Sequence, residues 1–381
     1  MGPTPYPLRV MVAGGGFAAA ELVLALRALA QDRVDIELVA PSADLPFRPA
    51  ATATPFRRED VQVYDLAAIA ADAGAVVRQD TIEAVASDAH RVRLASGASR
   101  SYDALVLAVG ARARAAVPGA ITFRDQRDGH LVAALLDDLA ATRAKRVVFA
   151  APSGVSWTLP LYELALLASA ELDRRDLATE VVILTPEAVP LEVFGNGAST
   201  HVSRLLAEHG VRRLRGSAVS VAHRHVTLAT GESLSADGVV AVPRLVGRRI
   251  SGVPADWNGF VQVDRQGRVA ELDDVFAAGD VTQFPVKQGG LATQQADVIA
   301  AVLAARAGAD VDPPPGHSVL RARLLGADEP CYLRAELDAA GRPLASPGPP
   351  EVSDEPDWWP AAKLFGRHLS PWMAARGLAA R

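Results

Sequence analysis

Residues 14–16 are three consecutive glycines that join a short apolar run at residues 8–13 to a helix-forming stretch at residues 17–30. A second apolar run follows, so this part of the chain predicts a strand, a tight turn, a helix and another strand. With Ala19 the glycines fit the pattern Gly-x-Gly-x-x-Gly/Ala. The first glycine permits the turn, Gly16 lets a diphosphate approach the backbone, and Ala19 lets helix and strand pack closely. The turn therefore predicts a dinucleotide site at a helix N-terminus, where amide groups favour negative charge.

A second unit of the same kind follows, which indicates an internal duplication. Residues 147–151 are apolar, a turn comes next, and Pro160 opens another helical stretch. Residues 91–97 and 225–231 are both predicted hairpins that lead back to a further strand. We expect an α/β fold with two Rossmann-like dinucleotide-binding domains and a C-terminal segment. The expected boundaries are 1–115 and 251–310 for the two parts of the first domain, 116–250 for the second domain, and 311–381 for the C-terminal segment.

Composition and charge narrow the classes of function. With 381 residues, of which 50% are hydrophobic, the chain can bury a large core. A net charge of -5 without a block of lysine or arginine excludes nucleic acid as an expected partner. Residues 1–7 lack a signal-peptide pattern and no apolar run reaches membrane length, so we expect a cytoplasmic protein. Cys331 is the sole cysteine, so no redox-active dithiol can form within one chain.

Two later motifs extend the predicted site of the first domain. Residues 105–110 resemble the second FAD-contacting strand of a flavoprotein family that includes sulfide:quinone oxidoreductases and type II NADH dehydrogenases. Residues 275–280 resemble the third motif of that family, in which the aspartate accepts hydrogen bonds from the ribityl chain of FAD; in isolation Asp280 also fits a turn or helix N-cap aspartate. The end of the second strand has Ala40 in place of the usual acidic residue, with Ser42 as a weaker substitute. The residues expected to hold FAD are Gly14, Gly15, Gly16, Phe17, Ala18, Ala19, Ser42, Arg48, Ile82, Ala108, Gly110, Gly279, Asp280, Lys287 and Gly289.

The segment at residues 285–295 resembles the family segment whose helix begins beside the pyrimidine side of the flavin. The resemblance implies that Lys287 and the helix N-terminus stabilise the negative charge that develops on the reduced ring. Gln294 and Gln295 correspond to paired glutamines near the quinone in type II NADH dehydrogenases; the alternative is a solvated helix face.

The second unit departs from both of these relatives. Its turn has one glycine, and Pro152 removes an amide donor, so we expect NADH and NADPH to reduce a bound flavin slowly and without saturation. Residues 152–163 resemble sulfide:quinone oxidoreductases instead, but Trp157 stands where the catalytic cysteine of that family would be. Indole cannot carry sulfur, so sulfide oxidation by the family mechanism is excluded. Trp157 and Tyr162, with Lys287, are the residues expected at the substrate site.

Two further features have competing interpretations. His223 and His225 share one face of a predicted strand, but no third ligand is near, so no metal is expected. Residues 358–376 combine tryptophans, apolar residues and basic residues at helical spacing. They predict either an interfacial helix on a membrane or, as we favour, a helix that covers the flavin pocket or contacts a second copy in a homodimer.

The sequence thus predicts an FAD-dependent oxidoreductase that transfers electrons to a small organic acceptor such as a quinone. The substrate is expected against the flavin ring, near residues 47–49 and Lys287. One alternative is an NAD(P)H-dependent quinone or dye reductase, with NAD(P)H as a second cofactor. The other is a flavoprotein that has lost turnover and acts as a redox sensor or binding partner.

Overall fold

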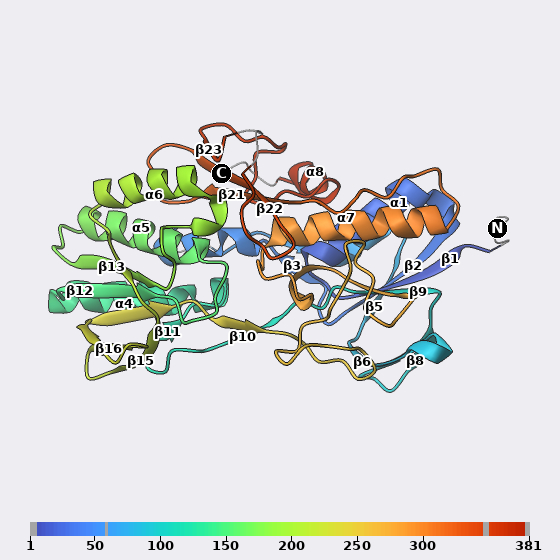
Figure 1. The fold of residues 1–381 in the computed structure, drawn as a ribbon, viewed down its shortest axis with the longest axis horizontal. Coiled ribbons are helices and arrows are strands. Elements are labelled where there is room, and N and C mark those ends of the chain that lie inside the picture. The colour runs from blue at the N-terminus through green and yellow to red at the C-terminus, as the bar shows by residue number, and fades with distance from the viewer. Residues whose placement is uncertain (1–5, 58–59, 346–349, 378–381) are drawn as a thin grey trace.

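A five-stranded parallel sheet forms one half of the protein. The computed structural model describes residues 6–57, 60–345 and 350–377. The strand order is β20-β9-β1-β2-β5, and helices α1 and α7 pack side by side on one face of the sheet (Figure 1). The elements of this half are β1 (Leu8–Ala13), α1 (Phe17–Ala30), β2 (Val34–Ala40), α3 (Leu66–Asp72), β5 (Val76–Gln79), β9 (Ala104–Leu107), β20 (Val275–Ala277) and α7 (Gly289–Arg306).

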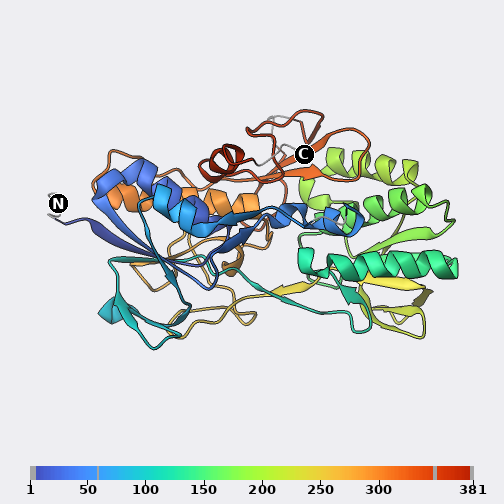
Figure 2. The ribbon, with the colours of Figure 1, turned by 180° about the vertical axis from the view of Figure 1, so that it is seen from behind.

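A second five-stranded parallel sheet forms the other half, with the order β11-β18-β12-β13-β14. Figure 2 shows its helices from behind. The elements are β11 (Ile121–Thr122), α4 (Gly129–Thr142), β12 (Arg146–Ala150), α5 (Leu159–Arg174), β13 (Glu180–Thr185), α6 (Asn196–Glu208), β14 (Arg212–Arg215) and β18 (Gly238–Ala241).

The two halves repeat one topology, which confirms the expected α/β fold with two Rossmann-like units. The run β9-β1-β2-β5 in one sheet corresponds to β18-β12-β13-β14 in the other. Each half also has a three-stranded antiparallel sheet, formed by β6 (Ile82–Ala86), β7 (Arg91–Leu94) and β8 (Ser99–Ser101), or by β15 (Ala218–Ala222), β16 (His225–Leu228) and β17 (Ser233–Ser235). The repeats differ in the connection after their first strand. Only residues 14–16 separate β1 from α1, whereas residues 151–158 separate β12 from α5.

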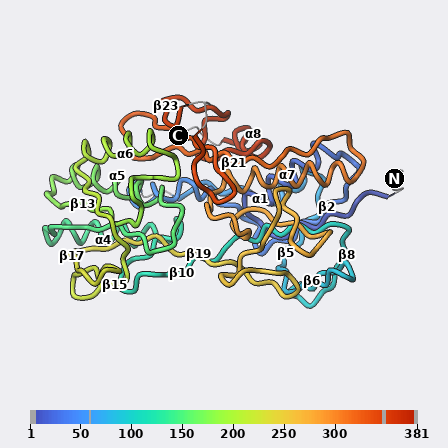
Figure 3. Tube along the Cα trace, in the orientation of Figure 1, coloured from blue at the N-terminus to red at the C-terminus, as the bar shows by residue number. Residues whose placement is uncertain are grey.

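Short antiparallel elements complete the two halves and join them. Strand β10 (Arg112–Arg114) pairs with β19 (Arg244–Val246), and this ribbon lies between the halves (Figure 3). The N-terminal part of the chain also contains β3 (Asp44–Pro46), α2 (Thr54–Arg57) and β4 (Val63–Asp65), and α2 packs against α4 and α5 of the second half.

The C-terminal segment packs against both halves. It consists of the antiparallel strands β21 (Ser318–Leu324), β22 (Cys331–Leu337) and β23 (Val352–Ser353), followed by α8 (Leu369–Ala374). Leu320 and Leu333 of its sheet belong to the core of the second half, whereas Leu369 and Met373 of α8 belong to the core of the first half. The apolar side of α8 is therefore buried within the protein, as expected for a helix that covers the core, whereas Trp359 before it is exposed. In the part of the chain that the structure describes, no helix combines the length and the apolar character needed to cross a membrane.

Candidate active site

Gly14 lies directly after β1, and its backbone contacts Val39 on β2 and Ala108 just after β9. Its backbone has φ 132°, and a Cβ atom there would lie 2.1 Å from the carbonyl oxygen of Ala108. Its amide donates to the carbonyl of Val39 at 2.8 Å. Any side chain at this position would both strain the backbone and push β1 away from the segment after β9.

The N-terminus of α1 opens onto free space. Gly16 is the N-cap, its backbone is exposed, and no atom lies within 4 Å of a Cβ atom built on it. Gly16 has no side chain that could cap the first turn of α1, while Ala18 and Ala19 are buried beneath it. The first amide groups of the helix therefore face a space that a diphosphate fits.

Asp280 follows β20 and presents an acceptor without a partner. Among the residues that the structure describes, none forms a hydrogen bond with its carboxylate. Burial raises the pKa of Asp280, and the positive charges of Lys287 and Arg48 oppose that rise. The preceding Gly279 donates its amide to Oε1 of Gln295 at 2.7 Å, which fixes this turn to α7. A partly buried carboxylate of this kind fits the hydroxyl groups of a polyol chain.

Lys287 lies just before α7 and near Asp280. Its Nζ donates to the carbonyl of Thr282 and lies 3.9 Å from the ring centroid of Phe260. Burial lowers the pKa of Lys287 to about 8, although Asp280 and Asp256 favour its charged form. The lysine is thus a cation whose charge changes close to neutral pH.

The other residues expected around the cofactor vary in exposure. Ser42 is exposed, and its hydroxyl accepts from the amide of Asp44 at 3.0 Å. Arg48 is exposed at the start of a short 3-10 helix. Phe17 packs edge-on against Phe47, with ring centroids 6.2 Å apart. The remaining four are Ala108, which is buried after β9, Gly110, which has φ 67°, Ile82, which is half-buried on β6, and Gly289, which packs against Leu364 and Phe17.

Tyr162 and Trp157 occupy different environments in the second half. Tyr162 is fully buried, and its hydroxyl donates to Glu187 at 2.8 Å. The same carboxylate accepts from Thr158 at 2.7 Å and from Thr185 at 2.9 Å, and burial raises the pKa of Glu187. Tyr162 therefore orients an internal carboxylate and does not line an open pocket. This differs from our expectation because packing against β13 decides where its side chain lies.

Trp157 belongs to the turn that lies against the segment before α7. It is half-buried and packs on Phe194, with ring centroids 6.0 Å apart. The hydroxyl of the adjacent Ser156 donates to the carbonyl of Pro285. The turn of the second unit is thus brought next to the segment that contains Lys287.

A buried ion pair that the sequence did not predict joins the halves to the C-terminal segment. Nζ of Lys363 lies 2.5 Å from Oε2 of Glu163 on α5. The same oxygen accepts from the hydroxyl of Thr52 at 2.8 Å, and Oε1 accepts from the amide of Leu325 at 3.1 Å. Burial lowers the pKa of Lys363, and Glu163 opposes that effect. Glu163 ends the segment at residues 152–163 that resembles sulfide:quinone oxidoreductases, but its partners come from residues more than 100 positions away.

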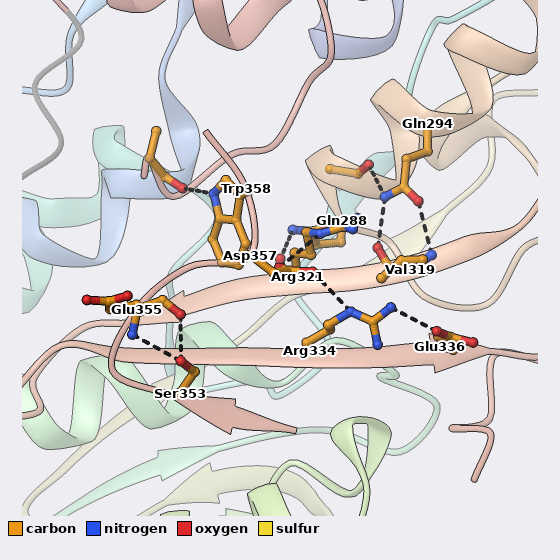
Figure 4. A network of polar contacts seen from close by, with 12 residues as sticks. Gln288, Gln294, Val319, Arg321, Arg334, Glu336, Ser353, Glu355, Asp357 and Trp358 are labelled. Carbon is orange, nitrogen blue, oxygen red and sulfur yellow. Dashed lines mark hydrogen bonds and ion pairs between the residues drawn. The ribbon is translucent and has the colours of Figure 1, made fainter. Parts of the chain in front are cut away.

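Gln294 and Gln295 have structural partners, so they do not form a solvated helix face. The amide of Gln294 forms two hydrogen bonds with the backbone of Val319 on β21, at 2.8 and 3.0 Å (Figure 4). Gln295 accepts from Gly279 as described above. The pair therefore fixes the C-terminal sheet and the turn before Asp280 to α7.

A cluster of possible metal ligands lies between α1, α7 and α8. Ligand atoms of Glu21, Asp297 and His368 lie within 4.8 Å of one another. Both carboxylate oxygens of Glu21 already accept backbone amides, from His368 and Leu369, at 2.7 Å each. We interpret the cluster as an anchor for α8. His223 and His225 do not belong to it, and Nδ1 of His225 lies 2.9 Å from the carbonyl of His223.

Comparison with known proteins places this geometry in context. Residues 8–305 match the family described as pyridine nucleotide-disulphide oxidoreductase. An NADH dehydrogenase-like protein of Mycobacterium tuberculosis is 31% identical over 295 residues, which cover 72% of each chain. The ferredoxin--NAD(+) reductase component of the anthranilate 1,2-dioxygenase system of Burkholderia cepacia is 28% identical over 71% of this chain and 67% of its own.

Solved structures show the same fold at lower sequence identity. The sulfide:quinone oxidoreductase of Aquifex aeolicus has a TM-score of 0.77 and 21% identity, with 86% of this chain and 84% of that chain covered. A ferredoxin reductase of Rhodopseudomonas palustris has a TM-score of 0.65 and 21% identity, with 86% and 82% covered.

Proposed function

Because the chain belongs to the pyridine nucleotide-disulphide oxidoreductase family, we propose that this oxidoreductase uses FAD to pass electrons to a small organic acceptor such as a quinone. In this proposal residues 1–115 and 251–310 form the flavin domain, and residues 116–250 form the second domain. The observation that carries the proposal is the open N-terminus of α1 near Asp280, whose carboxylate has no hydrogen-bond partner in the described part of the chain.

The residues of the first half fit FAD at both of these points. The uncapped first turn of α1, behind Gly16, would hold the diphosphate, and the carboxylate of Asp280 would accept from hydroxyl groups of the ribityl chain. Bound FAD would supply the capacity to accept two electrons and to return them to an acceptor.

We propose that Lys287 stabilises the negative charge that develops on the flavin ring when it is reduced. Its ammonium group lies between the carbonyl of Thr282 and the ring of Phe260, near the start of α7. In this position a cation and a helix N-terminus together favour negative charge in the space they face. Trp157, half-buried beside the same segment, is proposed to shape the substrate pocket.

A dithiol route is incompatible with this chain. Cys331 is the one cysteine in the sequence, and its side chain is buried on β22. Burial raises the pKa of the Cys331 thiol to about 11, so the nucleophilic thiolate is scarce at neutral pH. In this proposal electrons leave the bound flavin directly for the acceptor.

A second candidate is a reductase that takes its electrons from NADH or NADPH. The names of the relatives favour it, since one is NADH dehydrogenase-like and another is a ferredoxin--NAD(+) reductase component. Flavin reduction by either nucleotide under anaerobic conditions, with a rate that saturates, would select this candidate. A bound flavin that no tested donor reduces would instead favour a flavoprotein that acts as a redox sensor or binding partner.

The test of the proposed function begins with the bound cofactor. The purified protein should release FAD on denaturation, and after anaerobic reduction by dithionite a water-soluble quinone should reoxidise the flavin. Gly14→Ala should abolish FAD retention because the added methyl group meets the carbonyl of Ala108. Gly97→Ala, at another positive-φ glycine but in the hairpin between β7 and β8, should retain FAD. Release of FMN, or failure to take up added FAD, would refute the proposal.

A further inference from the structure

Lysine is rare in this chain, which uses arginine for most of its cations. Three of its 39 lysines and arginines are lysines, and these are Lys145, Lys287 and Lys363. An arginine stays charged at any ordinary pH, whereas a buried lysine can lose its charge near neutral pH. Burial lowers the pKa of Lys287 to about 8. Whether this side chain carries its charge therefore depends on the groups that surround it.

The ammonium group of Lys287 lies over the face of an aromatic ring. Its Nζ is 3.9 Å from the ring centroid of Phe260 and donates to the carbonyl of Thr282. The face of an aromatic ring is electron-rich, so it attracts a cation at this distance, and more strongly where water is excluded. Asp256, on the same turn as Phe260, and Asp280, after β20, also favour the protonated lysine. The ring therefore acts together with two carboxylates against the effect of burial.

The turn at residues 256–260 fixes the position of Phe260. Oδ1 of Asp256 accepts from the amide of Phe260 at 2.8 Å, and the carbonyl of Phe260 accepts from the amide of Asp256, also at 2.8 Å. Nη2 of Arg249 donates to the carbonyls of Asp256 and Trp257, at 3.0 and 2.9 Å. These contacts close the turn and anchor it to the segment after β19.

The residue after Phe260 pairs with the segment that contains Thr282. The amide of Val261 donates to the carbonyl of residue 281, and the carbonyl of Val261 accepts from the amide of residue 283, at 2.9 Å each. Thr282 lies between these two residues. One set of backbone hydrogen bonds thus places both the ring and the carbonyl that contact the ammonium group of Lys287.

We propose that Phe260 is a positioning residue for the reaction at the flavin, because its ring holds the ammonium group of Lys287 in place and in the charged form. The charge of Lys287 favours the reduced flavin, so a ring that retains this charge makes the flavin easier to reduce at neutral pH. The effect on the flavin rests on the proposed function. The contact between the ring and the ammonium group does not depend on it.

The first test measures the pKa of Lys287 in the purified full-length protein, by NMR of lysine labelled with carbon-13 at Cε. Lys287→Met identifies the signal of that residue among the three lysines. Phe260→Leu should lower the pKa of Lys287 by about one unit, because the ring no longer attracts the cation. Phe260→Tyr keeps a ring and should restore the wild-type value. The pKa of the exposed Lys145 should be the same in all variants.

Two further comparisons separate the attraction by the ring from a structural effect of the substitution. Trp257→Leu removes an exposed aromatic side chain from the same turn and should leave the pKa of Lys287 unchanged. Fluorinated phenylalanines incorporated at position 260 keep the shape of the side chain, while each fluorine withdraws electron density from the ring face. The pKa of Lys287 should therefore fall stepwise with the number of fluorine atoms. The charged neighbours Asp256, Asp280 and Arg48 are retained throughout.

The second test measures the midpoint potential of the flavin against pH in the FAD-loaded protein. The step caused by Lys287 should move to lower pH in Phe260→Leu and stay in place in Phe260→Tyr and Trp257→Leu. An unchanged pKa of Lys287 in Phe260→Leu and across the fluorinated series would overturn the proposal, and so would a lowered pKa without a displaced step. A purified protein that does not bind FAD would count against the proposed function instead, and the NMR titration would still decide whether the ring holds the charge of Lys287.

Discussion

Replacing Asp297 by asparagine should stabilise the protein at neutral pH. Asp297 lies on α7 beside Glu21 of α1, and its buried Oδ1 has no hydrogen-bond partner among the described residues. Burial raises the pKa of Asp297 from 3.8 to about 6, while the hydrogen bond with Glu21 acts in the opposite direction. The charged form of the side chain is therefore disfavoured in the folded protein.

The sign and size of the effect follow from proton linkage. Because the pKa is higher in the folded state, the native protein binds more protons between pH 4 and 6, and the free energy of unfolding falls as pH rises through this window. Burial and Asp297 also raise the pKa of Glu21, so the two carboxyl groups titrate as a pair. A rise from 3.8 to about 6 corresponds to roughly 3 kcal/mol at 1.36 kcal/mol per unit, which is an upper limit for the pair. Asp297→Asn cannot ionise, so it should regain up to this amount at pH 7 and almost nothing at pH 4.

Thermal unfolding of the FAD-loaded protein at pH 4, 5, 6 and 7 measures the difference. The midpoint of Asp297→Asn should exceed that of the wild type at pH 7, and the two should converge toward pH 4. Asp88→Asn, in an exposed 3-10 turn, is the matched control and should show no such pH-dependent gain. A gain of equal size at pH 4 and pH 7, or a loss at pH 7, would refute the reasoning.

Three further predictions concern the proposed flavin site. Asp280→Ala should weaken FAD retention roughly ten- to a hundredfold, because a charged acceptor is lost. Equilibrium dialysis measures the affinity for FAD, with Asp273→Ala at an exposed position as the control variant. Equal retention by the two variants would contradict the prediction. Lys287 loses its charge as pH rises through about 8, so the flavin should become harder to reduce above that pH. Lys287→Met should abolish this step in anaerobic potential measurements, and its persistence would exclude Lys287 as the source. Cys331→Ser should leave the rate of flavin reduction unchanged in stopped-flow measurements, and a large loss in a folded variant would show that the thiol participates.

The sequence was informative wherever a local pattern decides the structure. The glycine turn before Phe17 and the order of strands around it follow from hydrophobic periodicity and from the size of glycine. The duplication was visible because each unit repeats the same succession of strand, turn, helix and hairpin. These features place Gly16 and the first turn of α1 without any knowledge of tertiary contacts.

Long-range packing decided the features that the sequence did not predict. Tyr162 belongs to a local motif, but its side chain lies inward because Glu187 accepts its hydroxyl. Gln294 bonds to β21, a strand of the C-terminal sheet that local patterns did not reveal. The β10–β19 ribbon depends on the pairing of residues 112–114 with 244–246, and no local periodicity links segments so far apart.

The two turns of the duplicated fold also differ in which substitutions they can accept. At residue 14 the carbonyl of Ala108 leaves no room for a Cβ atom, so almost every substitution is excluded by geometry. At Gly154 the same added atom would meet nothing within 4 Å, although the backbone conformation there still favours glycine. Saturation mutagenesis should therefore show a sharper loss of fold at residue 14 than at residue 154, where backbone strain alone opposes a side chain. After duplication, the second turn is the one in which a side chain can be added without a collision between strands.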